Sequence, residues 1–216
     1  MKGAPDQPRQ RAVRVGVAVP AAGSGQRMGG VRKPFLELAG EPVLQHALRP
    51  FLADERVVSI CVALRVEDAE SPPSWLTSLA PRVRTVAGSD TRGASVRLAV
   101  AALPQDVDVI AVHDGARPLV SDEVVRKCID LAAGGIGAVA GTPAIDTMKT
   151  VDRRARIVST LDRSVLWHAH TPQVFPADVL RRAYASGDEE ATDDSGLVER
   201  LGGVVEMVDA GPSNLK

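Results

Sequence analysis

Aromatic side chains are scarce in this sequence, where Trp, Tyr and Phe together make up 3% of 216 residues. So few rings argue against a surface that binds nucleic acid by stacking on its bases. An excess of one charge is missing as well, because 26 basic and 27 acidic residues leave a formal net charge of −1. General attachment to nucleic acid or to an anionic membrane requires a basic excess. We therefore expect neither as a partner, and any cations that matter must act locally.

Cysteines and long hydrophobic runs are also lacking. The two cysteines, Cys61 and Cys128, both stand in apolar runs, which indicates reduced core residues of a cytosolic protein. No segment approaches the roughly 20 apolar residues of a membrane span, and the polar start "MKGAPDQPRQR" is not typical of a signal peptide. We expect a cytoplasmic protein whose residues 1–12 form a disordered tail.

Short β-branched runs alternate with helix-like segments through the rest of the chain. The expected strands are 13–19, 57–64, 83–87, 107–112, 136–140 and 204–208, and the expected helices are 43–52, 74–79, 94–103, 121–133, 176–185 and 194–201. This alternation predicts an α/β fold, a Rossmann-like, mostly parallel sheet with helices on both faces. The length fits a single domain over residues 13–216.

One segment interrupts that alternation. Residues 146–167, "DTMKTVDRRARIVSTLDRSVLW", alternate polar and apolar side chains without a long helical face. The pattern favours a β-hairpin, and we expect a protruding β-arm over 145–168 as a subdomain. Such a basic arm is either a solvated ribbon or a part that reaches another subunit.

A glycine-rich stretch, "PAAGSGQRMGGVRKPFLELAG" at 20–40, directly follows the first apolar run. Glycines let backbone N–H groups approach a ligand closely, and Arg27, Arg32 and Lys33 indicate that the ligand is an anion. Together they favour a cradle for a polyphosphate.

The glycine-rich stretch matches neither the dinucleotide-binding fingerprint nor the Walker A phosphate loop. Gly23 and Gly25 supply G-x-G, but Met28 stands where a dinucleotide fingerprint needs its third glycine, and no acidic residue ends the second strand. No Gly-Lys-Ser/Thr follows, so a Walker A loop is excluded too. The sequence argues against a dehydrogenase.

Two further polar segments follow predicted strands, "AGSDTRGAS" at 87–95 and "VHDGARP" at 112–118. Asp114 could hold a divalent cation together with substrate phosphates, or cap a turn. Asp90 and Ser95 could read the edge of a base, while Ser95 could equally be a helix N-cap or first-turn residue. Because ligands bind beyond the carboxyl ends of parallel strands, we expect all three polar segments to meet at one edge of the sheet.

The ordered set of motifs "PAAGSGQRM…RKPF", "GSDTRGASV", "HDGARP", "DTMK", "DRSVLWHAHTPQVF", "TDDSGLVE" and "NLK" resembles the 2-C-methyl-D-erythritol 4-phosphate cytidylyltransferases of the non-mevalonate isoprenoid pathway. The resemblance runs from about residue 15 to residue 216. It implies a nucleotidyltransferase domain whose β-arm clasps a second subunit, and hence a homodimer. It also implies Mg²⁺-dependent transfer of a cytidylyl group from CTP to 2-C-methyl-D-erythritol 4-phosphate, with release of pyrophosphate.

The resemblance further assigns roles to single residues. It implies that the catalytic cations are Arg27, Lys33 and Lys216, and that the nucleotide is bound by Ala21, Ala22, Gly23, Gly25, Ser89, Asp90 and Ser95. It implies that the second substrate is bound by Asp114, Arg117, Thr147, Arg163 and Thr171, with Asp114 also holding the metal.

The alternative is a ribitol-5-phosphate cytidylyltransferase or another sugar nucleotidyltransferase, which shares part of the motif set. "DTMK" and "LWHA" favour the methylerythritol enzymes. The sequence departs from that family in three places. Arg32 precedes the loop lysine where the family usually has proline, and Ser89 replaces a glycine. Family members also continue beyond the position of Lys216 into a helix, without which an apolar patch would be exposed.

Overall fold

The computed structural model describes residues 11–23, 32–187 and 192–216. Among these residues, a sheet of seven strands forms the centre of the molecule, in the order β11-β7-β10-β6-β1-β4-β5. Its strands are β1 (Val15–Pro20), β4 (Val57–Leu64), β5 (Val83–Ala87), β6 (Val109–Val112), β7 (Gly137–Pro143), β10 (Trp167–Pro176) and β11 (Val205–Asp209). All neighbours are parallel except β10, which runs antiparallel to both β6 and β7.

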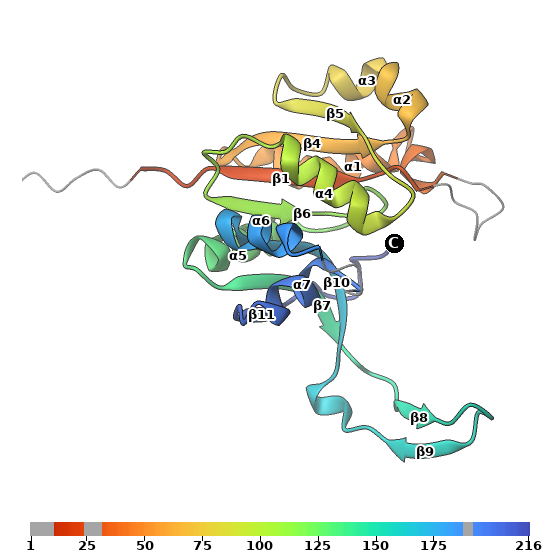
Figure 1. Cartoon of the computed structure of the whole chain (residues 1–216). Coiled ribbons are helices and arrows are strands. Elements are labelled where there is room, and N and C mark those ends of the chain that lie inside the picture. The colour runs from red at the N-terminus through yellow and green to blue at the C-terminus, as the bar shows by residue number, and fades with distance from the viewer. Residues whose placement is uncertain (1–10, 24–31, 188–191) are drawn as a thin grey trace, which may run out of the picture.

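Helices cover both faces of this sheet (Figure 1). They are α1 (Val43–Ala53), α2 (Val66–Glu70), α3 (Ser74–Thr77), α4 (Arg92–Ala102), α5 (Asp122–Ala133), α6 (Ala177–Ala185) and α7 (Asp194–Arg200). Alternate residues of each strand enter two separate cores. Val17 and Val19 of β1 pack in the core that holds α1 and α5, whereas Ala18 packs in the core that holds α4, α6 and α7. The expected Rossmann-like α/β fold is confirmed.

The central strands are apolar on both faces because helices remove both faces from water. Residues 15–19 of β1 are all buried, as are seven of the eight residues of β4. Cys61 of β4 and Cys128 of α5 are free thiols with no exposed surface, as the sequence predicts. In the part of the chain that is described, no helix is both long and apolar enough to cross a bilayer.

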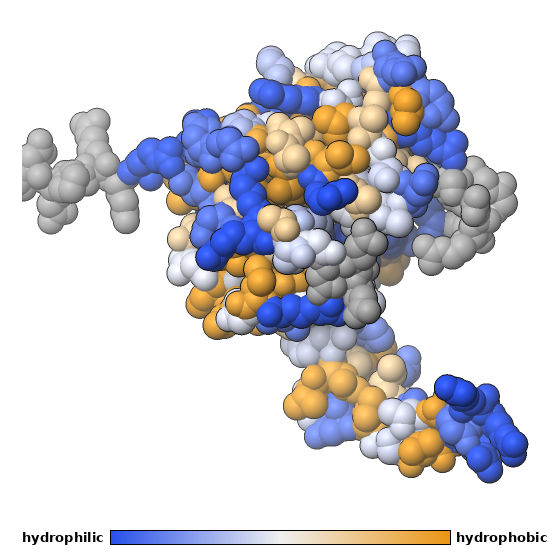
Figure 2. All heavy atoms as spheres, viewed as in Figure 1, coloured by the Kyte–Doolittle hydropathy of each residue, from blue (hydrophilic) through white to orange (hydrophobic). Residues whose placement is uncertain are grey.

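The segment 145–168 leaves the sheet as an arm (Figure 1). Strands β8 (Lys149–Val151) and β9 (Ile157–Thr160) pair antiparallel in it, and the 3-10 helix η3 (Arg163–Val165) leads back to the sheet. Apolar side chains gather along the arm in Figure 2, and Ile145 and Val165 are 78% and 75% exposed. The hairpin expected from the alternating pattern is therefore present.

Strand β10 has no counterpart in the sequence analysis, which assigns no strand between 168 and 175. The segment "WHAHTPQVFP" mixes polar residues and prolines, so neither an alternating nor a continuous apolar pattern marks it. Its register is decisive for the site, because Gln173 pairs with Val112 at the end of β6. Since β10 is antiparallel to β6, the residues just before Gln173 lie beyond the carboxyl end of β6.

Candidate active site

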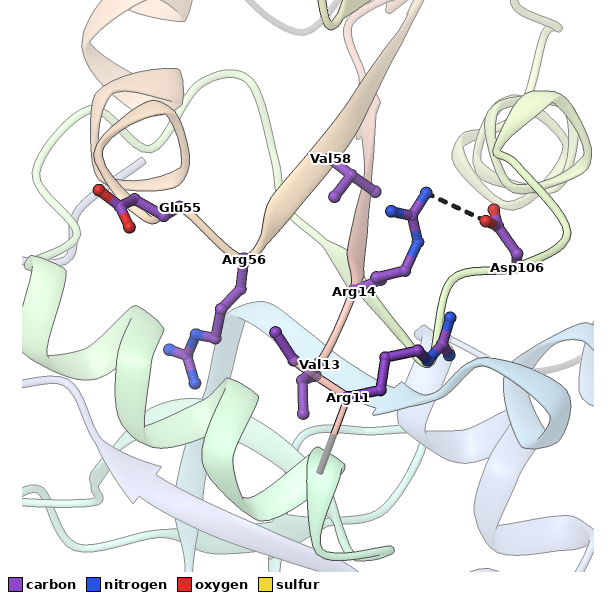
Figure 3. A pocket seen from close by; sticks show the side chains of 8 residues that line it. Arg11, Val13, Arg14, Glu55, Arg56, Val58 and Asp106 are labelled. Atoms are coloured by element: carbon purple, nitrogen blue, oxygen red, sulfur yellow. Dashed lines mark ion pairs between the residues drawn. The ribbon is translucent and has the colours of Figure 1, made fainter. Parts of the chain in front are cut away.

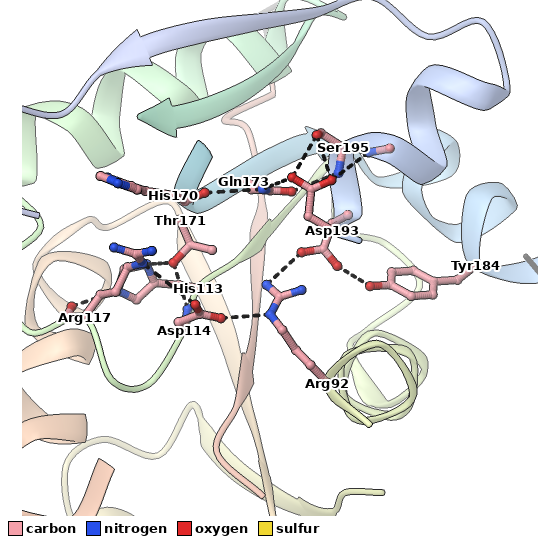
Figure 4. Close-up of polar contacts among 12 residues, drawn as sticks. Arg92, His113, Asp114, Arg117, His170, Thr171, Gln173, Tyr184, Asp193 and Ser195 are labelled. Atoms are coloured by element: carbon pink, nitrogen blue, oxygen red, sulfur yellow. Dashed lines mark hydrogen bonds and ion pairs between the residues drawn. The ribbon is translucent and has the colours of Figure 1, made fainter. Parts of the chain in front are cut away.

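Asp114 lies directly beyond β6 at the carboxyl edge of the sheet and is surrounded by cationic side chains (Figure 4). Only 7% of the residue is exposed. Its Oδ1 atom accepts a hydrogen bond from Nε of Arg92 at 2.9 Å, and its Oδ2 atom accepts one from Nζ of Lys216 at 2.7 Å. Nε of Arg117 stands 3.7 Å from the same Oδ2 atom. Burial opposes ionisation of Asp114, but Arg92 and Lys216 outweigh it and hold the pKa of this carboxyl well below its usual range.

Thr171 reaches Asp114 from β10, as the register requires. Its Oγ1 atom accepts the backbone N–H of Asp114 at 3.0 Å and lies 3.2 Å from Nδ1 of His113. Nε2 of His113 faces the carbonyl oxygen of Arg117 at 3.1 Å. A neutral imidazole can donate a hydrogen bond from Nε2 to the Arg117 carbonyl oxygen and accept one at Nδ1 from the Thr171 hydroxyl, so all these groups are hydrogen-bonded. Burial lowers the pKa of His113 to about 4, which agrees with that neutral form.

The segment after β11 carries Lys216 to the same edge. β11 is parallel to β7, so the chain leaves the sheet at its carboxyl side. Asn214, which is 1% exposed, then donates from Nδ2 to the carbonyl oxygen of Thr171 at 2.9 Å. Arg117 donates from Nη1 to the carbonyl oxygen of Asn214 at 2.8 Å. These two bonds fix the peptide that precedes Lys216.

The loop that enters α4 is held by its own serine. Oγ of Ser95 accepts the backbone N–H of Ser89 at 2.9 Å and lies within 3.0 Å of the carbonyl oxygens of Ser89 and Thr91. Thr91, whose hydroxyl accepts the N–H of Ala94, is the N-cap of α4. The suggestion that Ser95 is an N-cap is therefore wrong, because the helix begins three residues earlier; Ser95 lies in its first turn.

Gly88 brings this loop against the glycine-rich stretch. A Cβ atom at position 88 would lie 2.6 Å from Cβ of Ala22 and 3.1 Å from the carbonyl oxygen of Leu64, so only glycine allows this approach. Ala21 is buried and bonds through its N–H to Ala63, whereas Gly23 is exposed. Asp90 is also exposed. The nucleotide-binding residues predicted in the two loops thus lie on adjoining segments.

The two described cations of the glycine-rich stretch differ in their surroundings. Arg32 pairs with Asp68, and its guanidinium lies 4.2 Å above the ring of Phe35. Lys33 begins a 3-10 helix, η2 (Lys33–Phe35), and pairs with no carboxylate of the described chain. This difference leaves the Lys33 ammonium, rather than the Arg32 guanidinium, available to a ligand. The predicted residues Gly25 and Arg27 lie outside the described residues.

The remaining predicted substrate residues stand apart from Asp114 within one chain. Thr147 and Arg163 are exposed on the arm, which projects away from the sheet (Figure 1). Nη1 of Arg163 donates to the carbonyl oxygen of Ile145 at 2.6 Å. The structure therefore brings together Asp114, Arg117, Thr171 and Lys216, but does not bring the two arm residues to them.

Sequence reasoning missed two charged residues of the cluster. Arg92 and Asp194 stand inside quoted motifs, "GSDTRGASV" and "TDDSGLVE", yet no role is predicted for either. Nη2 of Arg92 donates to Oδ2 of Asp194 at 2.9 Å, while its Nε binds Asp114. Asp194 is 1% exposed, and Tyr184 donates its hydroxyl to the Oδ1 atom of this carboxylate. Neither residue carries a local signal, because the burial of Asp194 and its contact with Arg92 are known only from the structure.

The donor set suits a metal that arrives with its substrate rather than a resident ion. No group of three or more His, Cys, Asp or Glu side chains gathers within the described ranges. Mg²⁺ is often bound by one or two carboxylates plus substrate phosphates. Asp114 offers one carboxylate, and the side chain of Lys216, which pairs with its Oδ2 atom, is 45% exposed.

A hollow lies at the amino edge of the sheet, opposite the edge that carries Asp114 (Figure 3). Arg11, Val13, Arg14, Arg56 and Asp106 are among its lining residues. Its arginines are already paired, as Arg14 is with Asp106 at 3.1 Å. It contains no residue that the sequence predicts to bind a ligand.

Comparisons with known proteins show the family to which the chain is similar. The family model described as 2-C-methyl-D-erythritol 4-phosphate cytidylyltransferase matches residues 15–216. The chain is 40% identical over 220 residues to the 2-C-methyl-D-erythritol 4-phosphate cytidylyltransferase of Solibacter usitatus, covering 94% of this chain and 90% of that one. It is 42% identical to the enzyme of that name from Saccharopolyspora erythraea, covering 92% of this chain and 91% of the relative.

Solved structures give the same answer. The 4-diphosphocytidyl-2C-methyl-D-erythritol synthase of Anaerococcus prevotii superposes with a TM-score of 0.84 at 28% identity, covering 95% of this chain and 90% of the other. The 2-C-methyl-D-erythritol 4-phosphate cytidylyltransferase of Thermus thermophilus gives 0.75 at 30% identity, covering 95% and 92%. Fold, cationic edge and sequence relationship together establish that this chain belongs to the 2-C-methyl-D-erythritol 4-phosphate cytidylyltransferase family of enzymes.

Proposed function

We propose that this chain transfers a cytidylyl group from CTP to 2-C-methyl-D-erythritol 4-phosphate by direct in-line attack. A phosphate oxygen of the sugar phosphate forms a bond to the α-phosphorus of CTP, while the bond between that phosphorus and the bridging oxygen breaks. The products are 4-diphosphocytidyl-2-C-methyl-D-erythritol and pyrophosphate. The observation that carries this proposal is the gathering of Arg92, Arg117 and Lys216 around one carboxylate at the ligand-binding edge of the sheet.

Repulsion between two phosphorylated reactants is the obstacle that such a site has to overcome. Negative charge also accumulates on the pentacoordinate α-phosphate during the transfer. Cations held in place before the reaction stabilise that charge without reorganising, and they are most effective where water is limited. Arg117 is 12% exposed at its side chain and anchored through Asn214, which supports this role. The attacking atom belongs to the substrate, so the chemistry requires no protein nucleophile.

Nucleotide selection falls to the two adjoining loops. We assign the cytosine to the exposed backbone and side chains of Ser89 and Asp90, and the ribose to Ala22 and Gly23. The internal hydrogen bonds of Ser95 support this assignment, because they hold the loop in one shape before CTP arrives. Lys33 supplies a mobile cation for the triphosphate.

Asp114 is the residue assigned to Mg²⁺. The carboxylate would hold the ion together with oxygens of the triphosphate, and Lys216 would release Oδ2 as it turned to the phosphates. When bound, the ion supplies charge neutralisation at the phosphates. The low pKa of Asp114 keeps this ligand ionised at neutral pH.

The arm completes the site in a homodimer. Thr147 and Arg163 are exposed on the arm, which projects away from the sheet that carries Asp114 (Figure 1). Exposed apolar side chains of the same arm, such as Ile157 and Val158 at 66% and 68%, favour burial against another subunit. We propose that these two residues reach the sugar phosphate bound by the partner.

A pyrophosphate-release assay tests the reaction. CTP, ATP, GTP and UTP are each combined with 2-C-methyl-D-erythritol 4-phosphate or with ribitol 5-phosphate, with and without Mg²⁺. We expect rapid release only with CTP, 2-C-methyl-D-erythritol 4-phosphate and Mg²⁺ together. Preference for ribitol 5-phosphate would reassign the substrate, and equal rates after complete chelation of divalent ions would remove the metal from the proposal.

A further inference from the structure

One guanidinium links two carboxylates that are far apart in the sequence. Nε of Arg92 binds Oδ1 of Asp114, and Nη2 of Arg92 binds Oδ2 of Asp194, both at 2.9 Å. Asp114 is 22 positions away from Arg92 and Asp194 is 102 positions away. Figure 4 shows Arg92 reaching from the start of α4 toward Asp114. The planar fork of arginine can engage two such acceptors at once, whereas lysine has a single point charge.

Asp194 is built into the fold as a fixed anchor for Arg92. It is the first residue of α7, it is 1% exposed, and its second oxygen accepts the Tyr184 hydroxyl. Burial and the neighbouring Asp194 charge raise the pKa of Tyr184 well above its usual range, so the phenol remains a donor. A buried carboxylate needs a cation in contact, and Arg92 is the one that Asp194 contacts.

This arrangement determines how Asp114 presents its oxygens. Arg92 occupies Oδ1 and thereby leaves Oδ2 to Lys216, the more exposed partner. Arg92 is also the first residue of α4, immediately after the loop that holds Ser89 and Asp90. The same side chain thus connects the loop assigned to the base with the carboxylate assigned to the metal.

We propose that Arg92 is a positioning residue for the transfer reaction, and that Asp194 acts through Arg92 to keep Asp114 in its reactive orientation. The inference rests on the proposed function, which gives Asp114 its role. It adds a positioning role for Arg92 and Asp194, to which no contact with either substrate is assigned. A displacement of about 1 Å at a reacting group can cost roughly 100-fold in rate, so a rigid anchor at this point has a large effect.

Kinetic variants separate this role from simple stability. In Arg92→Gln we expect kcat to fall roughly 100-fold, with the Kd for CTP within about threefold of wild type. Arg92→Lys should recover only a small part of that loss, because lysine cannot engage both carboxylates. Asp194→Asn, which keeps a hydrogen-bonding side chain but removes the anchor charge, should lower kcat about tenfold.

Matched controls lie close by on the same elements. Arg97→Gln replaces an arginine by glutamine at an exposed position of α4 and is the control for Arg92→Gln. Asp193→Asn is the control for Asp194→Asn, because Asp193 contacts Gln173 and Ser195 instead of Arg92. Both controls should keep wild-type kcat. Equal losses in Asp193→Asn and Asp194→Asn, or full activity in Arg92→Lys, would overturn the proposal.

The environment of the Asp114 carboxyl gives a readout that does not depend on turnover. Arg92 and Lys216 each bond to one of its oxygens, and Nε of Arg117 stands 3.7 Å from Oδ2. Carbon-13 NMR of labelled aspartate at neutral pH, with the Asp114 signal assigned from Asp114→Asn, should show that signal displaced in Arg92→Gln and in Asp194→Asn but not in Arg97→Gln. An unchanged signal in Asp194→Asn would contradict the coupling. Failure of the wild-type protein to release pyrophosphate would instead refute the proposed function, and it would leave the NMR comparison of Asp114 unaffected.

Discussion

Nζ of Lys216 lies 2.7 Å from Oδ2 of Asp114, although 102 positions separate the two residues. Asn214, two residues before Lys216, donates a hydrogen bond to the carbonyl oxygen of Thr171. The hydroxyl of Thr171 in turn accepts the backbone N–H of Asp114. The path of the chain after β11 therefore holds the ammonium at the carboxylate.

Replacing Lys216 tests that arrangement. We expect Lys216→Ala to lower kcat by roughly 10²–10³, equivalent to about 3–4 kcal/mol of transition-state stabilisation, because one preorganised cation is lost. Pyrophosphate release under saturating substrates measures the change. Leu215→Ala is the matched control, since that side chain is 63% exposed and adjacent. Comparable losses in the two variants would mean that the peptide, not the ammonium, matters.

Lys33 provides a second cation at the other loop. Lys33→Ala should reduce turnover by roughly 10²–10³ and leave thermal unfolding unchanged, because the side chain pairs with no carboxylate of the described chain. Stability and pyrophosphate release are measured on the same preparation. Near-normal turnover in a folded variant would refute the assigned role. Arg32→Ala should instead lower the unfolding temperature, because it removes the contacts of this side chain with Asp68 and Phe35.

The arm is expected to recognise the sugar phosphate. Arg163→Ala should raise the KM for 2-C-methyl-D-erythritol 4-phosphate far more than the KM for CTP, since only the former is assigned to the arm. Steady-state kinetics with each substrate varied in turn provide the measurement. Arg153→Ala, a similar change at another exposed position of the arm, is the control. Equal effects on both KM values would count against the arm assignment.

Mixing two impaired variants, assayed at a 2-C-methyl-D-erythritol 4-phosphate concentration well below the KM of Arg163→Ala, shows whether Arg163 acts across subunits. A hybrid of Lys33→Ala and Arg163→Ala subunits contains one site in which both residues are intact, provided that the arm serves the partner. Random exchange makes half of the dimers hybrids, so about a quarter of wild-type activity should return. No recovery despite demonstrated subunit exchange would place the arm residue in its own chain's site.

Burial of His113 predicts a pH dependence of folding. Its pKa is about 4 in the folded protein and about 6.5 when unfolded, so protonation favours unfolding. The contribution of neutral His113 to the free energy of unfolding is complete above pH 6.5 and is lost as the pH falls toward 4. Between pH 7.5 and 5 this loss amounts to about 2 kcal/mol. Urea unfolding should show this decrease in the free energy of unfolding in wild type and in His168→Gln, but not in His113→Gln. An equally large decrease in His113→Gln would refute the explanation.

The local patterns were enough to identify six of the seven strands that form the sheet, all except β10. β1 and β4 are marked by apolar, β-branched runs because both of their faces are covered by helices. The polar segments after β5 and β6 follow those strands directly, so parallel geometry alone predicts that they meet. The arm is marked by alternating polar and apolar side chains without a long helical face.

Local patterns failed at β10 and at the Arg92–Asp194 pair. β10 passes from the exposed arm into the buried sheet, so its burial changes along its length and no single period describes it. An ion pair between residues 102 positions apart leaves no local trace, since each partner looks like an ordinary surface charge in the sequence.

The sequence by itself determined the family, the alternating α/β order and the motifs that carry charge, because these depend on residue type and on neighbours within a few positions. Tertiary structure alone decided which cations share Asp114, that Arg92 is anchored by Asp194, and that Thr147 and Arg163 stand away from them. The physical reason is distance: such contacts depend on strand order, register and the path of the chain after β11, which bring together residues that no local spacing connects.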